Sequence, residues 1–152
     1  MQNTHNLDRL AGSLIDLMSV FNSPQRDEAL LRAADVSLDR ALFPLLVALD
    51  ARGPQTVAGL AGLIGRDHTT VSRQLSKLES LKLVQRYAGE TDRRQTAAHL
   101  TANGRKIVQK IASARRRLLA KALADWNEPE RHALATLTRR FADALLARGK
   151  GT

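Results

Sequence analysis

The strongest constraint in this sequence is a pair of short helical segments joined by a tight turn, between residues 56 and 84. Apolar residues recur every three or four positions on both sides of the turn Gly65-Arg66-Asp67, which is the spacing of a helix that buries one face. The inner faces consist of Leu60, Ala61 and Ile64 in the first segment and Val71, Leu75 and Leu78 in the second. Two short helices joined in this way predict a helix-turn-helix.

The residues that follow predict a β-hairpin. The segment from Leu83 to Ala88 alternates as a half-buried strand does. Gly89-Glu90-Thr91-Asp92 has the composition of a turn, and Gln95 to Leu100 can return as the partner strand. We therefore expect a winged helix-turn-helix, and we assign it to residues 36–100.

Helical segments precede this region. A helix is expected to end at Asn22-Ser23-Pro24, and its apolar stripe is Leu7, Leu10, Leu14, Leu17 and Phe21. A short helix is expected over about 26–34. Ser37 is predicted to cap a further helix from Leu38 to about Ala51, which Pro44 should bend because proline lacks the amide donor.

Helices also follow the hairpin. Thr101 is predicted to cap a long helix that runs to about Asp125, and Asn127-Glu128-Pro129-Glu130 resembles a capping box at the start of the last helix. The expected fold class is mainly α with a small β-wing. We assign residues 1–35 to an N-terminal dimerisation helix and connector, and residues 101–152 to the long helix and a C-terminal dimerisation helix.

The apolar stripes of the terminal helices predict a homodimer. A single winged helix-turn-helix needs about half of these 152 residues. The stripe of the first helix and the stripe Leu134, Leu137, Phe141 and Leu145 of the last one must therefore cover something else. Interleaved terminal helices of two subunits would bury both stripes and hold two reading heads at a fixed spacing.

The charge distribution points to a polyanionic partner. The formal net charge is +9, with −3 in residues 1–50, +4 in residues 51–100 and +8 in residues 101–152. An α-helix fits the major groove of B-DNA, so the predicted partner is double-stranded DNA. Five aromatic residues are too few for a platform on which single-stranded DNA or RNA bases stack.

The chain resembles the MarR family of winged helix-turn-helix transcription regulators. The resemblance lies in TVAGLAGLIGRDHTTVSRQLSKLESLKLV, residues 56–84, and in DRRQTAAHLT, residues 92–101. It covers about a third of the chain. The family usually has Lys-Gly where this chain has Leu81 and Lys82, so either a non-glycine accepts a left-handed conformation or the helix ends differently. The family also usually has a small apolar residue at the position of Arg66.

The outer face of the second short helix supplies the candidate DNA contacts. Arg73 is the candidate for a bidentate contact to guanine, and hydroxyls near the helix start suit phosphate. The candidate DNA contacts of this helix are His68, Thr69, Thr70, Ser72, Arg73 and Lys77. The resemblance implies that Arg94 enters the minor groove, braced by Asp92 and beside Arg93. The alternatives are a solvated helix face and a solvated turn. Arg115, Arg116 and Arg117 are expected to be solvated or interfacial.

The resemblance also implies a repressor that a small aromatic or phenolic ligand releases from a pseudo-palindromic operator. The candidate lining residues are Met18, Phe21, Phe43, His99 and Trp126, with His99 or an arginine of the long helix for an acid group. The alternative for these side chains is plain core or dimer interface.

Other function classes find no support in the sequence. The absence of cysteine excludes thiol catalysis and thiolate metal sites, and four widely spaced histidines give no paired ligand motif. We expect no enzyme, no cofactor and no metal. The longest apolar run has nine residues, which is too short to cross a membrane, and we expect a cytoplasmic protein. The competing function is a winged-helix module that contacts protein and associates with DNA only non-specifically.

Overall fold

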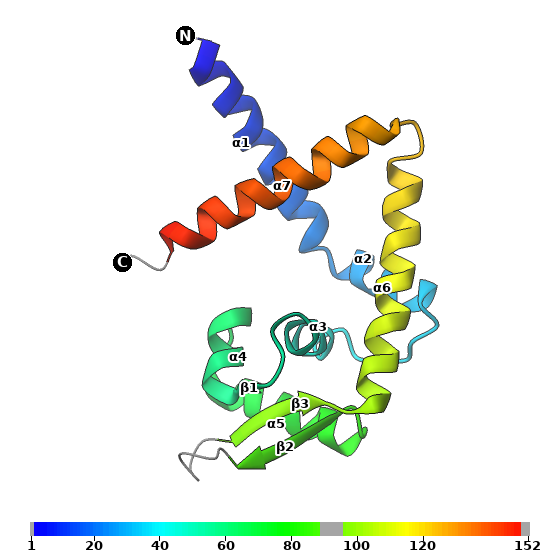
Figure 1. The fold of residues 1–152 in the computed structure, drawn as a ribbon. Coiled ribbons are helices and arrows are strands. Elements are labelled where there is room, and N and C mark those ends of the chain that lie inside the picture. Colours follow the sequence, from blue (N-terminus) through cyan, green and yellow to red (C-terminus); the bar gives the residue numbers. More distant parts are fainter. Residues whose placement is uncertain (1, 89–95, 150–152) are drawn as a thin grey trace. The chain divides into compact units, whose positions relative to one another are not determined.

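The computed structural model describes residues 2–88 and 96–149 and is mainly helical with one small sheet (Figure 1). It divides into two compact units, Met1–Arg115 and Arg116–Thr152. Helix α6 begins in the first unit and ends in the second. The elements are α1 (Gln2–Phe21), α2 (Pro24–Ala33), α3 (Phe43–Arg52), β1 (Gln55–Thr56), α4 (Val57–Ile64), α5 (His68–Ser80), β2 (Val84–Ala88), β3 (Thr96–Leu100), α6 (Ala102–Ala122) and α7 (Glu128–Arg148).

Helices α4 and α5 form the predicted helix-turn-helix. Thr56 caps α4, since its side chain accepts a hydrogen bond from the Gly59 amide at 3.0 Å. Gly65 ends α4 in the left-handed conformation with φ +67°, which glycine adopts without steric cost. Asp67 then caps α5. The local turn chemistry therefore sets where both helices begin and end.

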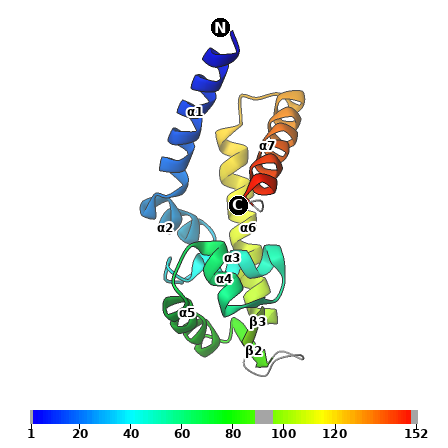
Figure 2. The same cartoon turned by 90° about the vertical axis from the view of Figure 1, so that its left-hand side faces the viewer.

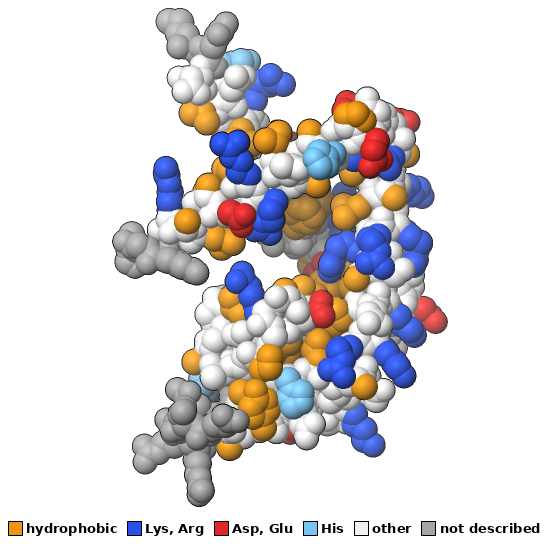
Figure 3. Space-filling model, in the orientation of Figure 1, with side chains coloured by type: hydrophobic (Ala, Val, Ile, Leu, Met, Phe, Trp, Pro, Cys, Tyr) orange, Lys and Arg blue, Asp and Glu red, His pale blue; other side chains and the backbone are white. Residues whose placement is uncertain are grey.

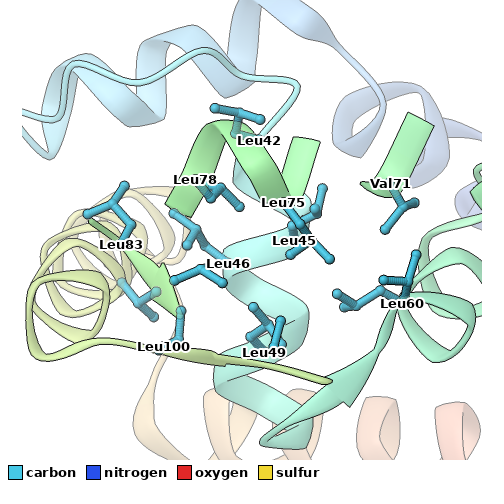
Figure 4. Packing of buried hydrophobic residues seen from close by; sticks show 14 residues of the cluster. Leu42, Leu45, Leu46, Leu49, Leu60, Val71, Leu75, Leu78, Leu83 and Leu100 are labelled. Atoms are coloured by element: carbon cyan, nitrogen blue, oxygen red, sulfur yellow. The ribbon is translucent and has the colours of Figure 1, made fainter. Parts of the chain in front are cut away.

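The core of the first unit lies between α3, α4, α5 and the sheet. Figure 4 shows leucine side chains from these elements meeting one another. The side chains with no exposed surface at all include Leu45, Leu46, Leu60, Val71, Leu75 and Leu78. Each such side chain contributes about 1.5–3 kcal/mol of transfer free energy on burial. The predicted inner stripe of α5 is confirmed in full.

The sheet has the order β1-β3-β2 and is antiparallel throughout. The hairpin of β2 and β3 is the predicted one, and its register pairs Val84 with Leu100 and Arg86 with Ala98. Strand β1 was not predicted from the sequence, since it is only two residues long; it pairs with β3 through Gln55 and Thr56. This strand ties the start of the helix-turn-helix to the hairpin.

The prediction of a helix from Leu38 was wrong. Helix α3 begins at Phe43, and Leu42 rather than Ser37 occupies the N-cap position. Pro44 lies in the first turn of α3, where its missing amide is not needed, and so it starts the helix rather than bending it. Ahead of it, the Asp39 carboxylate accepts a hydrogen bond from the Ala41 amide at 2.9 Å and forms a turn.

The end of α5 shows how the chain accommodates Leu81 and Lys82 where the MarR family usually has Lys-Gly. Lys82 adopts the left-handed conformation with φ +61°, so a non-glycine does occupy the position that favours glycine. The Lys82 amide donates to the Glu79 carbonyl and the Leu83 amide to the Leu78 carbonyl, the pattern of a Schellman motif. The Thr101 hydroxyl donates to the Lys82 carbonyl at 2.7 Å, which fastens this turn to the start of α6.

Helices α1 and α7 expose much of their apolar surface. Phe21 on α1 is 68 % exposed and Leu137 on α7 is 60 % exposed. None of the described residues of α7 is buried. The predicted capping box of α7 is present, because the Asn127 and Glu130 side chains each accept a hydrogen bond from the other residue's amide. Among the described helices, none is long and apolar enough to cross a membrane.

A prediction follows from the close packing of Gly104 in α6. A Cβ atom at Gly104 would lie 2.1 Å from the Leu83 carbonyl oxygen, so Gly104→Ala should destabilise the fold by about 1–3 kcal/mol or more. The control is Gly62→Ala in α4, where a Cβ atom meets nothing within 4 Å and should stabilise the helix by up to about 1 kcal/mol. Urea unfolding of both variants checks this. Equal effects of the two substitutions would contradict the packing.

Candidate nucleic-acid interface

Helix α5 presents a polar and basic face to solvent. His68, Thr69, Arg73 and Lys77 are exposed, whereas Thr70 and Ser72 are half-buried. The opposite face holds the buried stripe described above, so the helical period of α5 decides which side chains face outward. The structure therefore places all six predicted residues of this helix on its outer side or at its edge. Such a face carries long donors and small hydroxyls, as a helix in the major groove requires.

Asp67 holds the start of α5. Its carboxylate accepts hydrogen bonds from the Thr70 amide at 2.9 Å and from the Thr70 hydroxyl at 2.7 Å. These two bonds favour the charged carboxylate and lower the pKa of Asp67 below its ordinary value of 3.8, with a smaller contribution from the charge of Arg73. The cap also uses the Thr70 amide, so a phosphate at this end would meet side chains more than free amides.

Arg86 of β2 is a positioning residue that the sequence analysis missed. Its guanidinium donates to the Ser72 carbonyl in the middle of α5 and to the Ser76 hydroxyl at 3.3 Å. Its own amide donates to the Glu79 carboxylate at 3.2 Å. The available signal was the strand period, because Arg86 lies two residues after Val84 and so on the same, inward face. These bonds hold strand β2 of the hairpin against helix α5.

Arg66 explains the second departure from the family pattern. Its guanidinium donates to the Ala41 carbonyl at 2.6 Å and to the Gln74 side-chain oxygen at 2.8 Å. One side chain in the turn therefore bridges the segment before α3 and the middle of α5. A small apolar residue could not form either bond. Arg66 thus adds to the positioning of α5.

The hairpin lies beside α5, at the same end of the first unit (Figure 2). The proposed wing residues Asp92, Arg93 and Arg94 lie outside the described residues. The structure describes the two strands that flank these residues, since β2 ends at Ala88 and β3 begins at Thr96, its antiparallel partner.

Basic side chains also follow the length of α6 (Figure 3). Within the predicted arginine run, the guanidinium of Arg115 lies 6.0 Å from the centre of the Phe43 ring, while Arg116 and Arg117 are exposed. These placements agree with a solvated or interfacial run. In the described parts of the chain, no group of three or more His, Cys, Asp or Glu side chains could hold a metal ion.

The predicted ligand residues do not gather in one hollow. Phe43 lines a hollow of about 370 Å³ between α3, α4 and α6, together with Arg52 and Arg115. His99 lines a different hollow of about 550 Å³ at the base of the hairpin. Met18 and Phe21 are exposed on α1, and Trp126 is 42 % exposed in the second unit.

The lowered pKa of Asp67 predicts an acid-dependent loss of stability. The stabilisation from this cap is complete above pH 3.8, the ordinary pKa of Asp67, and is lost as the pH falls through the lowered value of the folded state. Asp67→Asn can still cap the helix but does not titrate. Unfolding midpoints measured from about pH 6 to about pH 2 should therefore fall more steeply for the wild type. Parallel curves for the two proteins would contradict this role of Asp67.

Comparisons with known proteins agree with this geometry. Residues 38–96 match the model of the MarR family. The chain is 28 % identical over 110 residues to the uncharacterized HTH-type transcriptional regulator YxaD of Bacillus subtilis. The matched region covers 72 % of this chain and 77 % of YxaD.

Solved structures share the fold over most of the chain. RV1404 from Mycobacterium tuberculosis has 26 % identity and a TM-score of 0.65 over 91 % of this chain and 90 % of that one. BpsR of Bordetella bronchiseptica, whose DNA binding is regulated by 6-hydroxynicotinic acid, has 26 % identity and a TM-score of 0.59 over 87 % and 92 %. A MarR family protein from Bacillus stearothermophilus has 19 % identity and a TM-score of 0.75 over 95 % and 96 %. Residues 38–96, which hold the helix-turn-helix and strand β2, match the MarR family, and the chain shares the fold of a MarR family protein over most of its length.

Proposed function

We propose that the protein is a homodimeric repressor that binds a pseudo-palindromic operator in double-stranded DNA. The observation that carries this proposal is the outer face of α5, which exposes Arg73 and Lys77 while the opposite stripe is fully buried. Bonds from Asp67, Arg66 and Arg86 hold this helix in place. The protein acts by binding rather than by catalysis, and it works in the cytoplasm.

In this proposal the residues of α5 divide between reading and anchoring. Arg73 donates to the O6 and N7 atoms of a guanine in the major groove. His68, Thr69 and Thr70 contact phosphate near the helix start, with Ser72 at the edge of the contact and Lys77 on the backbone further along. Base contacts give sequence preference and phosphate contacts give register.

The wing contributes a second contact. Arg94 at the tip of the hairpin enters the narrow minor groove, where the negative potential is strongest, and Asp92 orients it. Arg93 contacts phosphate or solvent. The position of β2 against α5 supports this arrangement, because it places the hairpin beside the helix that would enter the major groove.

The terminal helices form the dimer in this proposal. Exposed leucine, isoleucine, methionine and phenylalanine side chains on α1, and leucines on α7, give each chain apolar surface that a partner can cover. A two-fold axis between subunits sets the distance between two copies of α5, which corresponds to half-sites about one helical turn apart.

A small aromatic or phenolic ligand releases the repressor from DNA. The regulation of BpsR by 6-hydroxynicotinic acid supports this part of the proposal, since that protein shares the fold over most of both chains. Two hollows in the first unit have volumes suited to such a molecule.

The contact assigned to Arg73 predicts a loss of sequence preference. Arg73→Ala should cost about 1–3 kcal/mol per half-site on the cognate sequence and much less on random DNA. The matched control is Lys77→Ala on the same face, which should weaken both kinds of DNA about equally and lower the salt slope by about one. Gel shifts on fragments selected from a genomic library, repeated across a salt series, measure both effects.

Two outcomes would contradict the reading role. Equal losses for Arg73→Ala on cognate and random DNA would make Arg73 a phosphate contact. A wild-type protein that prefers no fragment over bulk DNA would favour the protein-interaction module instead.

The exposed apolar faces predict a stable dimer at micromolar concentration. Light scattering should give twice the chain mass of 16.7 kDa. Leu137→Glu places a charge on the apolar stripe of α7 and should shift the mass toward the monomer. The control Gln109→Glu adds the same charge at an exposed polar position of α6 and should leave the dimer intact. A folded wild-type monomer would remove the basis for two reading heads.

A further inference from the structure

A hollow of about 280 Å³ lies between helix α5 and the segment before α3. Thr70, Gln74 and Lys77 line it from α5, and Asp39 and Ala41 line it from the other side. Positions 70, 74 and 77 are four and three residues apart, so these side chains follow one strip of the helix, beside the buried stripe. Thr70 and Lys77 are already proposed to contact the DNA backbone, whereas Gln74 has no role in the proposed function.

The neighbour of Gln74 decides which end of its side-chain amide is available. One nitrogen of the Arg66 guanidinium donates to Gln74 Oε1 at 2.8 Å and to the Ala41 carbonyl at 2.6 Å. A guanidinium carries donors and no acceptor, so only the amide oxygen of Gln74 can meet it. Gln74 Nε2 then points away from Arg66, and it has no hydrogen-bond partner among the residues that the structure describes. Gln74 therefore offers the hollow hydrogen-bond donors and no free acceptor end.

A set of donors on this strip suits a phosphate. A helix in the major groove has a sugar-phosphate backbone along each side, so the centre of its outer face meets base edges and the flanks meet phosphate. Phosphate oxygens accept hydrogen bonds, and Lys77 in the same hollow supplies a positive charge. A glutamine that reads adenine uses its donor and its acceptor together, but here Arg66 engages the acceptor.

We propose that Gln74 Nε2 donates to a phosphate of the DNA backbone and that Arg66 orients Gln74 for this contact. Arg66 does not touch the DNA itself, because it is half-buried and donates to groups within the protein. The inference rests on the proposed function and adds to it a backbone contact. This contact depends on an arginine at the position where the MarR family usually has a small apolar residue.

Gel shifts on random DNA test the contact, because a phosphate contact needs no operator. Gln74→Ala should weaken binding by about tenfold per subunit, and by the same factor on cognate DNA. The salt slope should stay unchanged, since a neutral amide releases no counterion, whereas the control Lys77→Ala lowers the slope by about one. Arg66→Met should cause a similar loss of affinity, and it should also leave the slope unchanged although it removes a positive charge.

A double-mutant cycle tests whether Arg66 acts through Gln74. Once Gln74→Ala has removed the amide, adding Arg66→Met should weaken DNA binding by less than about twofold more. A purely structural role of Arg66 would make the two losses multiply. Urea unfolding of each variant measures the effect on stability separately.

Gln74→Glu reverses the outward group while it keeps the bond to Arg66. One carboxylate oxygen can accept from Arg66, and the other replaces the donor with a negative charge, so DNA binding should fall by at least about thirtyfold per subunit. The control Gln109→Glu adds the same charge at an exposed position of α6 and should cost less than about threefold.

Asp39 gives a test with the opposite sign. Its carboxylate lines the hollow and would repel a phosphate there, while its Oδ1 atom accepts from the Ala41 amide at 2.9 Å. Asparagine keeps this acceptor, so Asp39→Asn should strengthen DNA binding by about threefold per subunit. The control is Asp50→Asn, an exposed position near the other end of α3, which should have a clearly smaller effect.

The outcomes separate this inference from the proposed function. A loss for Gln74→Ala that is confined to one base of the operator would make Gln74 a base contact. Multiplying losses in the cycle, or equal gains for Asp39→Asn and Asp50→Asn, would also overturn the inference. Normal wild-type binding that Gln74→Ala leaves unchanged would refute the contact and leave the proposed function standing. A wild type that binds no DNA would overturn both.

Discussion

The proposed DNA-binding face depends on the burial of one stripe of helix α5. Val71, Leu75 and Leu78 have no exposed surface, and their spacing of three and four residues puts all of them on one side of the helix. Because a helix advances 100° per residue, burying this side leaves Arg73 and Lys77 no position other than the outer one. The core therefore selects the side chains that are proposed to contact DNA, and a polar substitution in the buried stripe would affect both DNA recognition and folding.

Burial also distinguishes the winged region from the terminal helices α1 and α7. The buried residues of the first unit come from α2, α3, α4, α5, the sheet, α6 and the short segments between them, and they form two clusters. Helices α1 and α7 add length and apolar area but no buried residue among those described. An isolated helix in water gains little from its own propensity and is stabilised mainly by packing of its apolar face. The terminal helices therefore need another apolar surface to stabilise them, whereas the winged region is stabilised by its own core.

Local chemistry made most of the fold predictable from the sequence. Caps at Thr56, Asp67, Thr101 and Asn127 involve residues within three positions of each other, so their patterns can be recognised without a structure. The wrong start of α3 came from placing Pro44 inside a helix, although proline fits the first turn better. The bonds of Arg66 to Ala41 and of Arg86 to Ser72 join residues 25 and 14 positions apart. The strand period places Arg86 on the inward face, but no periodicity identifies the partners of Arg86 and Arg66, and these contacts help to position helix α5.

These bonds also restrict how DNA binding can be regulated. Helix α5 is held by its own cap at Asp67, by Arg66 from the turn before it and by Arg86 from the hairpin, so it is already ordered before DNA arrives. A preorganised helix does not incur the entropic cost of ordering on binding. An effector that unfolded α5 would have to break all three sets of contacts, so this route of regulation has a high free-energy cost. The less costly change is to move the whole winged region as a rigid body or to tilt the hairpin against α5. In a dimer, a small rotation of each winged region would alter the distance between the two copies of α5, and this distance must match the spacing of the half-sites.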